Sequence, residues 1–234
     1  LLPPTTAMGA TLPILSRALA RQGSVGIQIS RLYASNTLGA VVGSALAGFV
    51  LLPWLGSQVS LWLNATFNLG VGWVALLTRV EAESETTRHS GSPAGRPGLL
   101  ALTFAMAGFA SLVLKICWTR ALAVLLGSSV YAFSAILVAF LTGIGLGSSF
   151  YSLLMKHRQP QLHFLSHLYA LTGLTALASL IWLPQLPPLF IWAFPYLKDS
   201  FEGLLVFQVF LCCLVLLLPT LAMGLGFPLV THLH

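Results

Sequence analysis

The sequence predicts an all-α fold, a polytopic bundle of about seven transmembrane helices. The first observation is composition: of 234 residues, 57% are hydrophobic and only 7% are charged, and the mean hydropathy is +0.90. A soluble domain carries charge at roughly 25% of its positions, so these few charges cannot coat a water-soluble surface. The second observation is the alternation of basic residues between successive connections, and the third is an internal repeat.

Apolar segments of span length define the expected helices. Crossing the hydrocarbon of a bilayer takes roughly 20 apolar residues, and a spanning segment must be helical because lipid cannot satisfy an open strand. By this criterion we expect spans at 1–16, 33–54, 58–78, 99–126, 129–155, 164–183 and 203–230.

Basic residues fall on alternate connections. Eight of them lie on the connections after the first, third and fifth spans, whereas the other connections carry only Lys198. This positive-inside pattern predicts that 79–98 is a cytoplasmic linker. Because the basic residues are scattered and form no stripe, the net charge of +6 does not indicate nucleic acid binding. The eight are Arg17, Arg21, Arg31, Arg79, Arg88, Arg96, Lys156 and Arg158.

The segment 184–202 interleaves prolines with aromatic residues. We expect it to form an outer connection that lies against the lipid headgroups. The residues concerned are Pro184, Pro187, Pro188, Pro195, Phe190, Trp192, Phe194 and Tyr196.

An internal repeat aligns residues 1–15 with 216–230 without gaps, at a constant offset of 215. The shared string is P-T-x-A-M-G-x-x-x-P, which pairs Pro4 with Pro219 and Pro13 with Pro228. The repeat spans six helices and so preserves orientation, as in parallel transporter repeats. We therefore expect a six-plus-six architecture, with 1–78 as the last three spans of one half, 79–98 as the junction and 99–234 as the first four spans of the other. Three spans are then expected before residue 1 and about two after residue 234.

Several strings resemble one known family. PTTAMGATLP, LYASNTLGAVVGSALAGFVLLPWLG (32–56), WTRALAVLLGSSVYAFSAILVAFLTGIGLGS (118–148) and PTLAMGLGFP resemble the membrane region of bacterial fused major-facilitator and spermidine-synthase-like proteins. The resemblance implies a major-facilitator-like bundle in the bacterial cytoplasmic membrane. It also implies that the bundle anchors or serves a soluble polyamine aminopropyltransferase domain, which these residues do not contain. The family pattern commonly has Glu where this chain has Lys115. The alternative is a self-standing facilitator-type transporter of a small solute.

Polar residues inside the expected spans are candidates for a pathway. Lys115 and Arg120 lie within the fourth span, where a charge costs roughly 2.5 to 3.5 kcal/mol at the bilayer centre. They either contact an anion in the bundle interior, or snorkel to the interface and cap carbonyls. Asn36, Asn64 and Asn68 either line a polar cavity or join helices, and joining is the commoner role.

Small residues and prolines predict helix packing and kinks. Gly39 with Gly43, and Gly143 with Gly147, form small-xxx-small stripes that allow close helix approach. Four prolines are expected to kink the first and last spans, which are Pro4, Pro13, Pro219 and Pro228.

No enzyme site is visible in the sequence. All five acidic residues lie in expected connections, and we find no nucleophile triad, carboxylate pair or phosphate loop. His163 and His167 have helical ligand spacing, but without a third ligand nearby we expect no metal and no cofactor. The expected partners are the lipid bilayer and, through the resemblance, a fused soluble synthase domain.

Overall fold

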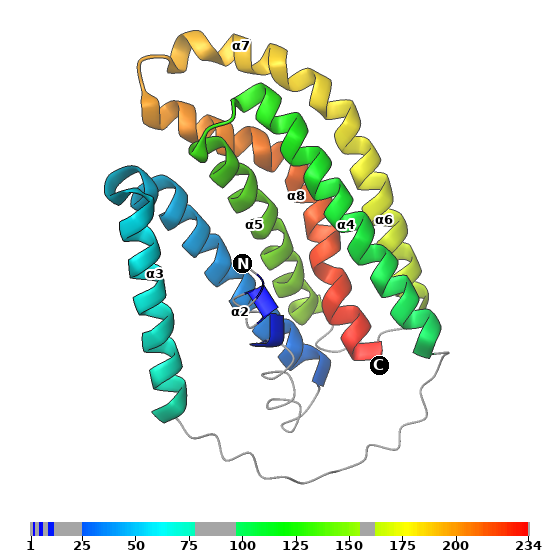
Figure 1. Cartoon of the computed structure of the whole chain (residues 1–234). Helices are drawn as coiled ribbons and strands as arrows, with labels where there is room; N and C mark the ends of the chain where they lie inside the picture. Colours follow the sequence, from blue (N-terminus) through cyan, green and yellow to red (C-terminus); the bar gives the residue numbers. More distant parts are fainter. Residues whose placement is uncertain are drawn as a thin grey trace.

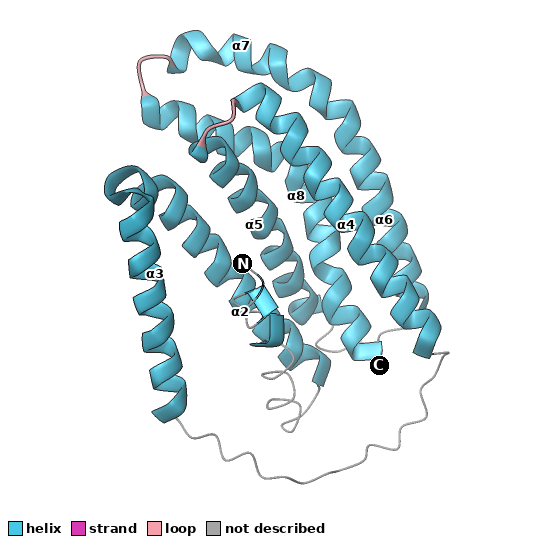
Figure 2. Cartoon of the chain, in the orientation of Figure 1, coloured by secondary structure: helices cyan, strands magenta, loops and turns pink. Residues whose placement is uncertain are grey.

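The computed structural model describes residues 25–77, 97–154 and 162–233, together with Leu2, Thr5, Thr6 and 9–11 near the start. The described residues form helices and their short connections, with no strand among them (Figure 2). The elements in chain order are α2 (Val25–Leu46), η1 (Ala47–Leu51), α3 (Leu52–Leu77), α4 (Pro97–Leu126), α5 (Val130–Leu154), α6 (Leu162–Trp182), η3 (Leu183–Gln185), α7 (Leu186–Leu197) and α8 (Phe201–Leu233).

Five helical stretches within the described ranges are long and apolar enough to cross a membrane. The all-α, multi-span character expected from composition is thus present, but with five such stretches where the sequence predicted seven. Most of the expected span 1–16 and most of the 79–98 linker lie outside the described residues. The five stretches are Gln28–Val74, Ala105–Leu126, Val130–Leu153, His163–Leu197 and Phe201–Val230.

The first stretch is a helical hairpin that contains the two spans expected at 33–54 and 58–78. α2 rises along the bundle and α3 descends beside it (Figure 1). The reversal is at Gly56, whose φ of 72° is in the left-handed region that favours glycine. The turn before it, η1, is a π-helix, and it brings Gly48 so close to α5 that a Cβ there would overlap the side chain of Ser134. The backbones of η1 and α5 therefore approach closely at this turn.

The core of the bundle is the contact between α5 and α8. Gly143, Gly147 and Gly224 have no room for a side chain: a Cβ on Gly143 would overlap the Thr220 hydroxyl, and a Cβ on Gly147 would overlap the Leu221 carbonyl. Close backbone approach of this kind increases van der Waals contact between the helices. In a membrane this contact drives helix association, because lipid tails are as apolar as the side chains and the hydrophobic effect does not favour burying them.

α8 changes direction along its length. It starts across the upper end of the bundle and then turns down through its middle (Figure 1). Pro219 and Pro228 lie inside this helix, and both are fully buried. Proline lacks the N–H that would bond the carbonyl four residues earlier, which is the usual cause of a change of direction within a helix.

The segment expected as an outer connection is helical instead. η3 and α7 continue α6 as far as Leu197, and α7 lies across the upper end of the bundle (Figure 1). The prolines do not prevent this, because Pro184, Pro187 and Pro188 occupy first turns, where a helix leaves N–H groups unpaired in any case. Only Pro195 lies in the interior of α7. The expected outer connection is thus helical over Leu183–Leu197, a detail that the sequence analysis did not predict.

Apolar side chains cover the outer surface. Trp54 is 84% exposed, Trp62 76% and Leu69 76%, all on α3, and α4 and α7 have similar outer faces. A water-soluble protein could not maintain such a surface, whereas lipid is a good solvent for it. Inside, one cluster of buried side chains surrounds Trp118 and Leu216, and a second surrounds Tyr151 and Leu229.

Candidate functional site: a central cavity

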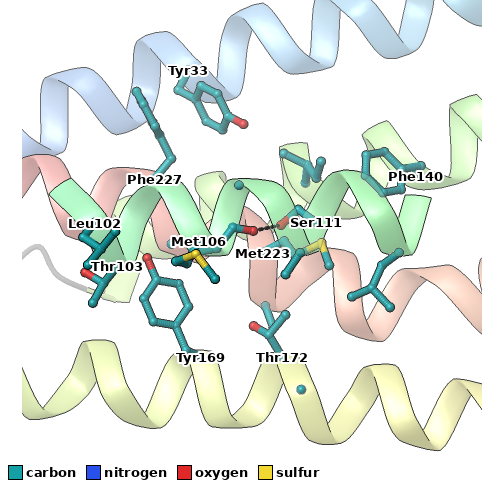
Figure 3. Close-up of a pocket in the computed structure, with 18 residues that line it drawn as sticks. Tyr33, Leu102, Thr103, Met106, Ser111, Phe140, Tyr169, Thr172, Met223 and Phe227 are labelled. Carbon is teal, nitrogen blue, oxygen red and sulfur yellow. Dashed lines mark hydrogen bonds between the residues drawn. The ribbon is translucent and has the colours of Figure 1, made fainter. Parts of the chain in front are cut away.

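A cavity of about 640 Å³ lies between five helices, α2, α4, α5, α6 and α8 (Figure 3). This volume is within the range of roughly 300 to 1,000 Å³ that is usual for small-molecule sites. Sites between the helices of a bundle are a common place for ligands, because facing side chains converge there.

Most side chains that line the cavity are aromatic or aliphatic, and two are methionines. On one side Tyr33 of α2 packs on Phe227 of α8, with ring centroids 4.6 Å apart. Met106 of α4 and Met223 of α8 bring their sulfur atoms into the cavity, where flexible thioethers adapt to the shape of an apolar occupant (Figure 3). None of the described residues that line the cavity carries a charge.

Hydroxyl groups supply the polarity of the lining. The Ser111 hydroxyl donates to the Ala107 carbonyl at 2.8 Å, and the Thr172 hydroxyl donates to the Leu168 carbonyl at 2.9 Å. Each hydroxyl proton is thus bonded within its own helix, and each hydroxyl oxygen keeps lone pairs that can accept a hydrogen bond. The hydroxyl of Tyr169 differs, because it is buried and has no hydrogen-bond partner among the described residues.

Two glycines hold part of the cavity open. Gly108 of α4 and Gly173 of α6 both line it, and a Cβ added to either would have no heavy atom within 4 Å. Both glycines are exposed, and a larger side chain there would meet no neighbouring atom at its Cβ.

Lys115 lies beside the cavity but does not line it. Its ammonium is 5.1 Å from the ring centroid of Phe140, a residue that lines the cavity with part of its surface. The half-buried lysine faces α5, in a hollow of only about 10 Å³, which is too small for a solute. A cation on an aromatic face is stabilised by the ring quadrupole, so this charge is accommodated by packing. Arg120 is exposed on the outer side of α4.

The three asparagines are not brought together. Asn36 is exposed on α2, and Asn64 and Asn68 are exposed on α3. The Asn68 amide donates to the Asn64 carbonyl at 2.9 Å and to its side-chain oxygen at 3.2 Å, so these two residues bond each other along one helix face. None of the three lines the cavity.

The small-residue stripes have different environments. Gly143 and Gly147 lie in the α5 and α8 contact, whereas a Cβ on Gly39 or Gly43 would meet nothing within 4 Å. On the α2 side the close approach is made by Gly48, which follows the predicted stripe and whose position depends on the π-helical turn. Pro4 and Pro13 lie outside the described residues.

No group of three metal-ligating side chains occurs in the described ranges. Nδ1 of His167 lies 2.6 Å from the His163 carbonyl, which is a contact within one helix turn.

The sequence analysis missed the cavity residues. Tyr33, Met106 and Tyr169 are single polar or adaptable residues in apolar helices, a pattern that also fits ordinary core packing. The weak signal was the pairing of glycine with hydroxyl residues on α4 and α6, as in Gly108 with Ser111 and Thr172 with Gly173.

No protein-family model matches the sequence, and neither a curated protein nor a solved structure matches the chain. The class is therefore defined by the fold and the site alone. The described chain is a bundle of apolar helices long enough to cross a membrane, and a partly open cavity of solute size lies between five of them, lined by described residues that carry no charge.

Proposed function

We propose that this bundle binds a small, uncharged solute in its central cavity and transfers it across the membrane as a facilitator-type transporter does. The observation that carries the proposal is the cavity of about 640 Å³ between α2, α4, α5, α6 and α8. A bundle that served only as an anchor has no need of such a space, since close packing is the default for protein interiors.

The absence of charge in the lining defines the class of solute. A buried ion needs a partner of opposite charge, and the described part of the lining offers neither a carboxylate nor a cation. A neutral solute with a large apolar surface fits the lining, whereas a polyamine, which carries several positive charges, does not.

Filling the cavity tests this function. In vesicles containing the purified protein, we expect saturable uptake of at least one solute from a panel of radiolabelled neutral compounds. The Gly173→Phe variant should lose most of this uptake, because the new ring enters the open space beside Gly173 without a clash at Cβ. Gly72→Phe on α3 is the matched control, since its Cβ also meets nothing within 4 Å and Gly72 does not line the cavity. Lack of uptake for every solute, or equal uptake by both variants, would refute transport through this cavity.

Orientation in the membrane is part of the proposal. We infer a multi-pass protein of a bacterial cytoplasmic membrane whose 79–98 linker is cytoplasmic. The start of α4 and the ends of α3 and α5 lie at one end of the bundle, opposite the connection between α7 and α8 (Figure 1). In single-cysteine variants of a chain without its native cysteines, an impermeant thiol reagent applied from outside should label position 199 and leave position 88 unlabelled. The reverse pattern would overturn the orientation.

A second candidate function is service to a fused spermidine-synthase-like domain, with the six-plus-six repeat continuing beyond the chain. The four strings quoted above favour it, and the third includes Trp118, whose indole N–H donates to the Ser179 hydroxyl at 2.9 Å. Reading the source gene through both ends tests this candidate. An open frame that continues into a soluble domain with a glycine-rich acidic loop supports it, and a stop directly after the bundle removes it.

A further inference from the structure

We propose that Tyr169 is the polar recognition residue of the central cavity and that its hydroxyl selects solutes with a hydrogen-bond acceptor on an apolar body. This inference rests on the proposed function of the cavity and narrows it to a class of ligand, namely neutral ketones, esters, ethers and similar molecules.

The first support is the state of the hydroxyl itself. Its oxygen is buried and bonds no group among the described residues. A buried hydroxyl without a partner is unfavourable, so proteins seldom retain one unless another group completes it. In this structure the ring projects from α6 toward Met106 and Thr103 of α4, across one end of the cavity (Figure 3).

The second support is the contrast with the hydroxyls of Ser111 and Thr172. Ser111 and Thr172 donate their protons to carbonyls of their own helices, so an occupant can use them only as acceptors. Tyr169 has an uncommitted proton, and an acceptor on the solute is the chemical complement of that proton.

The third support is the room around the ring. Gly226 of α8 faces Tyr169: a Cβ added there would be 3.9 Å from the ring carbon Cε1. The glycine therefore presents no side chain against the ring, and the proposal requires the ring to turn so that its buried hydroxyl reaches the solute. The body of the solute then lies against Met223 and Ile144, which line the same space.

A pair of probes that differ only in the acceptor tests the proposal. The probes are 2-propionylnaphthalene, which has a ketone, and 2-propylnaphthalene, which has none. Their binding is measured by equilibrium dialysis of the purified protein in detergent against empty micelles of the same detergent, so that partition into detergent cancels. The wild type should bind the ketone about tenfold more tightly than the hydrocarbon, which is the usual size of one buried hydrogen bond.

The decisive variant is Tyr169→Phe, which removes the hydroxyl and keeps the ring. It should lose the preference for the ketone and bind both probes with the affinity that the wild type has for the hydrocarbon. Tyr131→Phe is the matched control, because Tyr131 packs on Phe49 and Phe201 and does not line the cavity. It should keep the full preference.

The remaining outcomes separate this inference from the proposed function. If Tyr169→Phe keeps the preference for the ketone, or if the wild type binds both probes equally, the role of Tyr169 is refuted and solute binding in the cavity stands. If the wild type binds neither probe saturably, the cavity is not a site for apolar neutral molecules, and both proposals fail for this class.

Discussion

Substituting Gly147 by alanine should cost the bundle about 2 kcal/mol or more of unfolding free energy, in line with the usual cost of overpacking a core. A Cβ at this position would overlap the Leu221 carbonyl oxygen and lie 3.1 Å from the Cα of Gly224. Both obstacles are backbone atoms of α8 and cannot rotate away. The two helices must therefore separate, and the contacts along their whole crossing weaken with them.

The measurement is the unfolding midpoint of the purified protein as sodium dodecyl sulfate is added to mixed micelles. Gly43→Ala on α2 is the control, because it makes the same chemical change at a helical glycine where a Cβ meets nothing within 4 Å. The control should change stability by less than about 0.5 kcal/mol, as is usual for exposed positions. Equal losses for the two variants would show that the α5 and α8 contact does not organise the bundle.

Replacing Trp118 by alanine should destabilise the bundle by about 3 kcal/mol, at the lower end of the usual cost of removing a buried aromatic side chain. Trp118 is 2% exposed and packs between α4 and its neighbours in the same cluster as Leu122 and Leu216. The transfer part of the cost is small when lipid is the reference solvent, but the lost van der Waals contacts remain.

The hydrogen bond between Trp118 and Ser179 can be separated from this packing. Trp118→Phe and Ser179→Ala should each cost about 0.6 kcal/mol, the average for a hydrogen bond between membrane helices. The double variant should lose less than the sum, because both single changes break the same 2.9 Å bond between α4 and α6. Detergent unfolding again gives the values, with Trp62→Ala as control, since Trp62 is 76% exposed on α3. A loss for Trp62→Ala as large as that for Trp118→Ala would contradict the packing described.

Apolar segment length predicted four of the long helices well. The spans expected at 99–126, 129–155, 164–183 and 203–230 correspond to α4, α5, α6 and α8, because apolar length alone decides helix formation in lipid. At 184–197 the sequence predicted a connection without specifying its secondary structure; the structure makes it helical, which its first-turn prolines allow.

Packing partners were less predictable than elements. Two glycine stripes with the same spacing have opposite environments: Gly143 and Gly147 contact α8, whereas Gly39 and Gly43 contact nothing within 4 Å. The spacing indicates that one helix face carries only small side chains, but it does not indicate which helix packs against that face. In the same way, the sequence left open whether Lys115 faces the bundle interior or snorkels outward, and only the structure shows that its ammonium lies against the ring of Phe140.

The sequence by itself determined that this chain is helical and apolar enough for a membrane, because composition and segment length are local quantities. Only the tertiary structure decided where the cavity lies and which residues face it. Tyr33 meets Phe227 across 194 positions of chain. Tyr169 is opposite Gly226 of another helix. Such neighbours are set by how helices cross, and the crossing follows from close backbone contacts between helices distant in the sequence, which no local pattern specifies.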